Sequence, residues 1–359
     1  MSKRGNNIYH RADGRWEGRY YYKGTGKYKS VYGKTMTEAK EKLDKLRKEA
    51  FTPSRNCHYL VSDIMQMWLE NRKSHIKESS FASYQNKIQK HIMPYFGRLK
   101  YSALTADMLE KFIAEKTSQG LSSKYVGDMV IIMKSAAKWA EINHSFLNQV
   151  RNVELPKTIK KETETFSSSE QKALFQTLTG SSEPTVTGIK LAVYTGVRIG
   201  ELCALQWKDI DFERGVLKVT KTVQRISHST NQSKSAVMIT APKSDTSVRE
   251  IPLPMFVLDE LRRIKGTDNN YIVSGSEKII EPRCFTNRYK SVLKKAGVPS
   301  KKFHSLRHTF ATNALQQGFD VKTLSEILGH SGANVTMRVY LHTSMERKTA
   351  CMNLVQKIA

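Results

Sequence analysis

The sequence predicts a multidomain α+β protein. In this prediction a small N-terminal three-stranded sheet with a helix precedes a helical bundle and a mainly helical C-terminal domain with a small antiparallel sheet. Three observations support it. Apolar and polar residues alternate within positions 1–50, helical periodicity fills residues 57–155, and one β-rich region interrupts the helical patterns of residues 166–359. A chain of 359 residues is long enough for two or three domains with cores of their own.

Residues 1–50 alternate through IYH, RWEGRYYY and YKSVY, with turn signals at DG (13–14) and KGTG (23–26). This pattern predicts three antiparallel strands. Thr37 is then expected to cap a helix with Ala39, Leu43, Leu46 and Ala50 on its apolar face. The segment has 14 Lys and Arg against 6 acids, and a basic sheet suits binding in a DNA groove. A small solubilising domain is the alternative interpretation.

Residues 57–155 follow the linker FTPSRN and show helical spacing throughout. Four apolar runs mark the expected helices: Leu60, Val61, Ile64 and Trp68; Tyr84, Ile88 and Ile92; Leu109, Phe112 and Ile113; and Val126, Met129, Val130, Met133, Ala137 and Ala140. Because these residues suit the core of a bundle, we expect a helical domain here and no catalytic chemistry.

The polar stretch PKTIKKETETFSSSE reads as a linker before the last domain, residues 166–359. There the segments 216–223, 235–242 and 247–253 are rich in β-branched residues and predict three strands. A long polar loop, ISHSTNQSK, joins the first two strands, and a short turn, KSDT, joins the last two.

The composition favours a polyanionic partner. The chain has 59 Lys and Arg against 33 Asp and Glu, a net charge of +26, although a ribosomal or membrane-surface protein would show the same balance. The N-terminus lacks the apolar run of a signal peptide, and MVIIM (129–133) is too short to span a bilayer. Four scattered cysteines indicate neither a disulfide framework nor a zinc site. We therefore expect a cytoplasmic protein without a membrane partner.

The segment FHSLRHTFATN, residues 303–313, places Arg307 between His304 and His308 at the start of a helical pattern. Three interpretations are open. The histidines lie four apart on one helix face, which would suit a metal pair. Arg307 could instead clamp a phosphate, with His304 as its hydrogen-bonding neighbour. All three could also be ordinary surface residues.

Two further segments carry residues of similar chemistry. In YTGVRIGELCAL (194–205), Arg198 follows a glycine turn and Glu201 lies one helical turn later, a spacing that also suits a structural ion pair. In LSEILGHSGANVTMRVYLH (324–342), Gly329 ends a helical pattern, His330 follows it, and Tyr340 comes ten residues after His330.

Each motif alone is weak, but their order is specific. T-G-x-R-x-G-E-L precedes a lysine on a strand turn, then H-x-L-R-H, L-G-H and a tyrosine. This set resembles the tyrosine recombinase (phage integrase) family, and within it the integrases of temperate phages and conjugative transposons. The resemblance covers essentially the whole chain and is strongest over 190–342.

The resemblance implies a role for each matching residue. The catalytic set would be Arg198 and Arg307 as phosphate clamps, His304, His330, Lys243 on the turn between the second and third strands, and Tyr340 as nucleophile. Lys234 and Lys221 are nearby rivals of Lys243, but neither begins a tight turn. Glu201 and His308 would support the clamp without touching the phosphate.

The chemistry of these side chains agrees with the resemblance. A phosphodiester under attack gains negative charge on its non-bridging oxygens, which guanidinium forks are shaped to hold. A tyrosine with a pKa of about 10 needs a base to become nucleophilic, and a lysine can protonate the departing oxygen. The metal interpretation is weaker, because Ser305 stands where a metalloprotease helix has glutamate. No metal or other cofactor is expected.

The resemblance implies a site-specific DNA recombinase of the integrase and excisionase type, which forms a 3′-phosphotyrosine and integrates and excises a mobile element. Expected partners are double-stranded DNA, a homo-tetramer on that DNA, and an excisionase or DNA-bending accessory protein. Residues 1–50 would bind arm sites, while residues 57–155 and 166–359 would bind the core site. The tail after Tyr340 would dock in cis or in trans. A type IB-like topoisomerase and a non-catalytic DNA-binding regulator are the alternatives.

Overall fold

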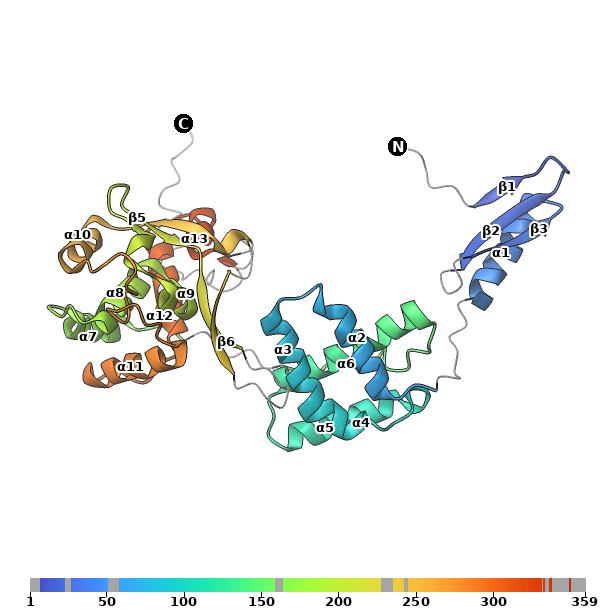
Figure 1. The fold of residues 1–359 in the computed structure, drawn as a ribbon, viewed down its shortest axis with the longest axis horizontal. Helices are drawn as coiled ribbons and strands as arrows, with labels where there is room; N and C mark the ends of the chain where they lie inside the picture. Colours follow the sequence, from blue (N-terminus) through green and yellow to red (C-terminus); the bar gives the residue numbers. More distant parts are fainter. Residues whose placement is uncertain are drawn as a thin grey trace. The chain divides into compact units, whose positions relative to one another are not determined.

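The computed structural model describes residues 7–22, 27–50, 58–158, 164–226, 235–241, 245–330, 332, 336–337 and 349 (Figure 1). Compact units divide the chain near residue 159, and each is described by itself. The expected mixture of helices and small antiparallel sheets is confirmed. Within the described residues, no helix is both long enough and apolar enough to cross a membrane.

The N-terminal sheet has the order β1-β2-β3 and is antiparallel throughout, as predicted; its strands are β1 (Ile8–His10), β2 (Trp16–Tyr22) and β3 (Lys27–Gly33). Helix α1 (Met36–Ala50) packs on it through Ala39 and Leu43, both fully buried. A Cβ on Gly33 would lie 2.5 Å from the amide nitrogen of Ala39, so the strand and the helix approach closely only because Gly33 has no side chain.

The predicted helix cap is wrong by two residues. The hydroxyl of Thr35, not Thr37, accepts a hydrogen bond from the Glu38 amide at 3.2 Å, and Thr37 lies inside α1. The reason is local, because Thr35 has a glutamate three residues later, which is the spacing of a capping box. Glu38 reaches back to the amide of Lys34 at 2.8 Å.

The next part of the first unit is the expected helical bundle. Its helices are α2 (Val61–Lys73), α3 (Glu78–Lys87), α4 (Met93–Phe96), α5 (Ala106–Ser118) and α6 (Ser123–His144). Residues from all four predicted apolar runs form one core, including Trp68, Ile92, Phe112 and Met129. A π-helical turn, Ile88–Ile92, was not predicted. There the amide of Met93 donates to the carbonyl of Ile88 five residues back, just before Pro94, which has no amide hydrogen to donate.

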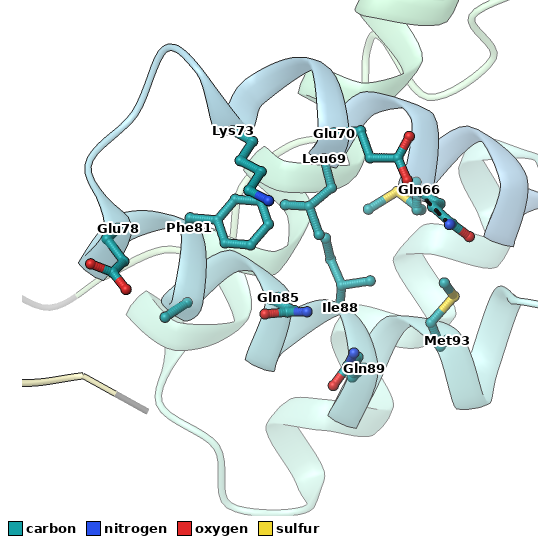
Figure 2. Close-up of a pocket in the computed structure, with 12 residues that line it drawn as sticks. Gln66, Leu69, Glu70, Lys73, Glu78, Phe81, Gln85, Ile88, Gln89 and Met93 are labelled. Atoms are coloured by element: carbon teal, nitrogen blue, oxygen red, sulfur yellow. Dashed lines mark hydrogen bonds between the residues drawn. The ribbon is translucent and has the colours of Figure 1, made fainter. Parts of the chain in front are cut away.

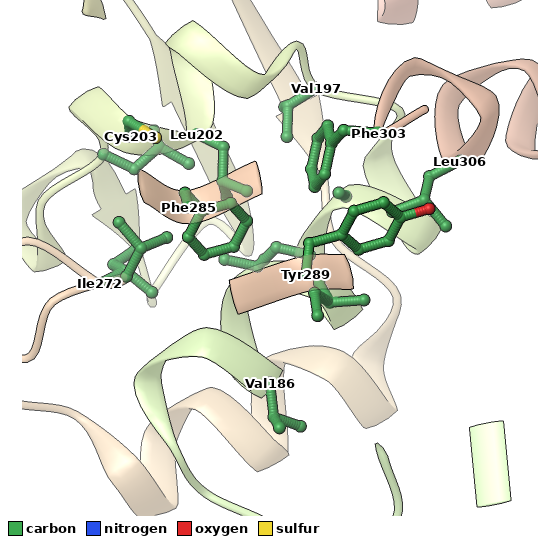
Figure 3. Close-up of a cluster of buried hydrophobic side chains, with 14 of the residues drawn as sticks. Val186, Val197, Leu202, Cys203, Ile272, Phe285, Tyr289, Phe303 and Leu306 are labelled. Carbon is green, nitrogen blue, oxygen red and sulfur yellow. The ribbon is translucent and has the colours of Figure 1, made fainter. Parts of the chain in front are cut away.

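The second unit is mainly helical. Its elements are α7 (Ser168–Leu178), α8 (Pro184–Thr195), α9 (Ile199–Ala204), β4 (Ile210–Asp211), β5 (Val216–Val219), β6 (Thr222–Ile226), β7 (Ala236–Thr240), β8 (Arg249–Pro252), α10 (Met255–Ile264), α11 (Pro282–Lys295), α12 (His304–Gln316) and α13 (Val321–Leu328). Figure 3 shows its core, in which Phe285 and Tyr289 of α11 pack with Leu202 of α9 and Phe303 before α12.

The β-rich region differs from its prediction. The strand expected over 216–223 is divided into β5 and β6, with Thr220 and Lys221 between them. Among the described residues, strand β5 pairs with β4 and β8, whereas β6 pairs with β7, so two small sheets replace the one expected. Strand β6 packs closely on α9, where a Cβ on Gly200 would lie 2.5 Å from the hydroxyl oxygen of Thr222. This packing holds β6 on α9 and away from the β5 ladder.

Candidate active site

Arg307 lies in the first turn of α12 and is only 2% exposed. Its Nη1 donates to the carbonyl of Gly196 and its Nη2 to the carbonyl of Leu328, both at 2.7 Å. These carbonyls lie at the C-terminal ends of α8 and α13, where backbone oxygens lack helical partners and the helix dipole is negative. The ends of two helices therefore fix the plane of the Arg307 guanidinium.

Gly196 makes this arrangement possible. Its φ of +64° is left-handed, and a Cβ there would lie 2.7 Å from a ring carbon of Phe310 and 2.8 Å from a methyl carbon of Leu328. Both the backbone conformation and the close packing exclude a larger residue. The glycine turn noted in the sequence before Arg198 thus also presents a carbonyl to Arg307.

Arg198 is the N-cap of α9, and its side chain remains 35% exposed. Its Nη1 bonds the carboxylate of Glu201 at 2.7 Å, its own amide bonds the same carboxylate at 2.9 Å, and its Nη2 donates to the carbonyl of Gly329 at 3.1 Å. Glu201 is 3% exposed. The buried carboxylate therefore orients a guanidinium that still reaches solvent and can meet a ligand.

Arg249 also belongs to this cluster, although the motifs in the sequence did not indicate it. Its Nη2 and Nη1 donate to the two carboxylate oxygens of Glu201 at 2.9 and 3.3 Å. Burial acts to raise the pKa of Glu201, but the hydrogen bond and charge of Arg249, followed by the charge of Arg198, outweigh burial and hold that pKa below its usual range. Glu201 is therefore an anion shared by two arginines.

Three histidines surround the arginines. The ring centroids of His304 and His308 are 4.5 Å apart, and the two rings are nearly perpendicular. Nδ1 of His330 lies 2.8 Å from the hydroxyl oxygen of the buried Thr336. Burial and then the charges of His304 and Arg307 lower the pKa of His308 to about 4.

His330 and His304 respond to the same charges. Burial and then the charges of Arg307 and Arg198 lower the pKa of His330 to about 4. The pKa of His304 is lowered by the same causes in the same order, although its ring still reaches solvent. At neutral pH these imidazoles are neutral, so each has one nitrogen that can accept a proton.

The remaining predicted residues are placed as follows. Tyr340, Lys243 and its rival Lys234 lie outside the described residues. The rival Lys221 is described, and its ammonium bonds Gln206 at 3.1 Å and pairs with Asp209 at 3.3 Å. Lys221 thus has structural partners of its own. Within the described ranges, no three His, Cys, Asp or Glu side chains are grouped so that they could hold a metal ion.

A separate pocket lies in the helical bundle between α2 and α3 (Figure 2). Its lining includes the apolar residues Leu69, Phe81, Ile88 and Met93, together with glutamines and charged residues. None of the residues predicted to act in catalysis lines this pocket, so the chemistry is assigned to the cluster in the second unit.

The guanidinium groups of Arg198 and Arg249 thus share the carboxylate of Glu201. The charge of Arg307 acts on His304, His308 and His330 beside them. Such a cluster suits a phosphodiester whose oxygens gain charge during reaction. Family membership defines the chain as an enzyme that cleaves and rejoins DNA, of the tyrosine recombinase class.

The chain belongs to the phage integrase family, whose model matches residues 164–347. Residues 60–117 match the N-terminal SAM-like domain of phage integrases. The chain is 28% identical over 357 residues to a tyrosine recombinase XerC-like protein of Caldanaerobacter subterraneus, with 89% of each chain covered. It is 24% identical over 325 residues to the ICEBs1 integrase of Bacillus subtilis, with 86% of each covered.

Solved structures show the same fold. The Tn1549 transposon integrase in complex with transposon right end DNA matches with a TM-score of 0.67 and 20% identity, over 82% of this chain and 99% of that one. A lambda integrase tetramer bound to a Holliday junction matches with a TM-score of 0.58 and 19% identity, over 92% and 96%. The predicted family and fold class are confirmed.

Proposed function

We propose that this recombinase integrates and excises a mobile element through a 3′-phosphotyrosine formed by Tyr340. The observation that carries the proposal is the cluster in the second unit, where Arg198 reaches solvent beside Arg307 and His330. These are the side chains that the family resemblance assigns to the reacting phosphate. The cluster favours catalysis over a regulator that only binds DNA, because DNA binding alone needs no buried carboxylate to orient an arginine.

In the proposed reaction the Tyr340 oxygen attacks the phosphorus, and a neutral imidazole accepts the phenol proton. Arg198 and Arg307 stabilise the charge on the non-bridging oxygens. The bond from phosphorus to the 5′-oxygen breaks, and Lys243 donates the proton that makes it a 5′-hydroxyl. Because the phosphotyrosine is a phosphodiester too, a 5′-hydroxyl of another duplex can reverse the steps without an external energy source.

The DNA surface of the second unit includes α11. This helix carries Arg283, Arg288, Lys290, Lys294 and Lys295, all exposed, and no acidic residue. Glu281, just before the helix, is paired with Arg225 at 2.6 Å. A helix face with this charge attracts the phosphate backbone whatever the base sequence.

The N-terminal sheet is proposed to bind separate arm sites. Tyr9, Tyr28 and Tyr32 of this sheet are exposed, the Arg19 guanidinium stacks over Tyr9, and that of Arg15 stacks over Tyr32. Flat aromatic and guanidinium groups on one sheet suit contacts with a DNA groove. The chain would then have three functional parts: residues 1–50 bind arm DNA, and residues 57–155 and 166–359 bind the core site.

On DNA the protein is proposed to act in the cytoplasm as a homo-tetramer, with an excisionase or DNA-bending protein as accessory partner. A lambda integrase of the same fold forms a tetramer bound to a Holliday junction.

The test uses duplexes with the sequence at the end of the mobile element that carries this gene, here called the core duplex. We expect the full chain to join two different core duplexes without ATP and to form a covalent adduct on a nicked core duplex. Adduct formation with relaxation of supercoiled DNA, but no joining, would indicate a topoisomerase. Binding without any adduct would indicate a regulator.

Lys243 has its own test, because a thiolate departs without a general acid while an alkoxide does not. The leaving thiol has a pKa of about 8.5, against about 15.7 for water as a model of the alcohol. Lys243→Ala is expected to cleave the ordinary core duplex very slowly and a 5′-thio core duplex at nearly the parent rate. Arg198→Ala, the control, should gain much less from sulfur. If the 5′-thio core duplex restores cleavage by Lys221→Ala or Lys234→Ala, but not by Lys243→Ala, the restored lysine is the general acid instead of Lys243.

A further inference from the structure

Arg249 is the first residue of β8, and its side chain is 6% exposed. Its guanidinium holds both carboxylate oxygens of Glu201, as described above. In addition, Nε donates to the carbonyl of Ile327 at 2.6 Å, and Nη1 donates to the carbonyl of Ser247 at 3.0 Å. One buried side chain therefore connects α9, the end of α13 and the entry to β8.

Each of these contacts leads to a residue of the proposed reaction. Glu201 binds Arg198. The end of α13, which Arg249 holds at Ile327, presents the Leu328 carbonyl to Arg307 and the Gly329 carbonyl to Arg198. His330 is the next residue in the chain after Gly329, so its position also depends on the end of α13. Arg249 thus lies one contact away from both proposed phosphate clamps without being exposed itself.

The packing around Arg249 leaves it little freedom. Gly329 has a left-handed φ of +62°, and a Cβ there would lie 2.9 Å from Cδ of Arg249 and 3.0 Å from its Nη1. The glycine that ends α13 therefore also makes space for this side chain. A guanidinium fork confined in this way transmits orientation, because its hydrogen bonds lie in one plane.

We propose that Arg249 is a positioning residue for DNA strand cleavage, which pairs Glu201 and fixes the end of α13 so that Arg198 and His330 keep their orientation. This inference rests on the proposed function. Arg249 is assigned no contact with DNA, because its bonds go to a buried carboxylate and to backbone carbonyls.

The ion pair between Arg249 and Glu201 also predicts how the stability of an Arg249 variant depends on pH. Among the described residues, Arg198, Arg249 and His304 are the charged and titratable groups that face Glu201. In the parent the pKa of Glu201 is lower in the folded than in the unfolded protein. The ionised Glu201 therefore stabilises the fold above its unfolded pKa, and this contribution is lost as pH falls through the folded pKa. Without Arg249 the raising effect of burial is expected to prevail. The sign then reverses, and stability is lost as pH rises through the folded pKa of Glu201.

The test compares the full-length parent with Arg249→Met, a side chain of similar length without charge. Adduct formation on the nicked core duplex is expected to fall about 100-fold at neutral pH, the cost of a clamp displaced by about 1 Å. Affinity for the core duplex should change by no more than about twofold, as for a residue away from the DNA. The melting temperature of Arg249→Met relative to the parent should fall between about pH 5 and about pH 8.

A double variant, Glu201→Gln with Arg249→Met, separates pairing from other effects. Glutamine does not titrate, so the new pH dependence of the melting temperature should disappear. The double variant should lose no more cleavage than Arg249→Met alone, because both substitutions remove the same Arg249–Glu201 ion pair. Arg249→Lys keeps the charge and serves if Arg249→Met does not fold. It should show no new pH dependence but reduced cleavage, since one ammonium cannot reproduce the fork that reaches both Glu201 and Ile327.

Three results would overturn the inference: cleavage by Arg249→Met within about twofold of the parent, an equal loss of cleavage and of DNA affinity, or losses of Glu201→Gln and Arg249→Met that multiply in the double variant. If the parent itself forms no adduct, the proposed function fails. The melting temperatures then still decide whether Arg249 holds Glu201.

Discussion

Tyr340→Phe is expected to bind the core duplex as tightly as the parent and to form no covalent adduct with it. Only the nucleophilic oxygen is lost, and a phenyl ring has no other atom that can form the phosphodiester bond. The measurement is gel separation, under denaturing conditions, of protein attached to a nicked core duplex, with affinity measured in parallel by a mobility shift.

Tyr289→Phe is the matched control. Tyr289 is fully buried in the core of the second unit (Figure 3), and its hydroxyl has no hydrogen-bond partner within the described structure. Removing that hydroxyl should leave adduct formation at the parent level. An adduct that survives denaturation in Tyr340→Phe would show that another residue is the nucleophile.

Arg307→Lys is expected to reduce adduct formation by about 10²- to 10³-fold, the loss seen when one donor to a developing oxyanion is removed. The Arg307 guanidinium bonds the carbonyls of Gly196 and Leu328 with different nitrogens. A single ammonium cannot span the ends of two helices and also present donors in one plane to a phosphate. Cleavage should therefore fall more than DNA affinity does.

Arg262→Lys is the control for this substitution. Arg262 lies on α10 with its side chain 47% exposed, and it contacts Asp259 and the carbonyl of Phe212. Its replacement should leave cleavage within about twofold of the parent, as is usual for a surface substitution. Thermal unfolding of both variants establishes whether they are folded. Parent-like cleavage by a folded Arg307→Lys would contradict the clamp role.

The helical bundle could be predicted closely because its signal is local. Apolar residues three and four apart lie on one helix face, so the predicted runs around Trp68, Phe112 and Met129 became one core. The errors arose where two local signals competed or a neighbour intervened. Thr35 and Thr37 are both good caps, and the position of Glu38 decided between them. The strand over 216–223 was divided by packing on α9, which its own residues do not indicate.

For the candidate site, too, the sequence identified some features and left others to be tested. Motif order in the sequence was sufficient to select Arg198, Glu201, His304, Arg307 and His330, and the structure places them in one cluster. Their roles, with those of Lys243 and Tyr340, remain predictions that the experiments above test.

Residue type and spacing along the chain are enough to identify the family, the succession of sheet, bundle and mainly helical unit, and the side chains that match the family's motifs. The groups that hold these side chains in place come from distant parts of the chain and are brought to them by folding. Arg249 reaches Glu201 across 48 positions, and Arg307 reaches Gly196 across 111. No periodicity spans such distances. Burial selects these partners, since an ion or a helix end removed from water must find its hydrogen bonds within the fold.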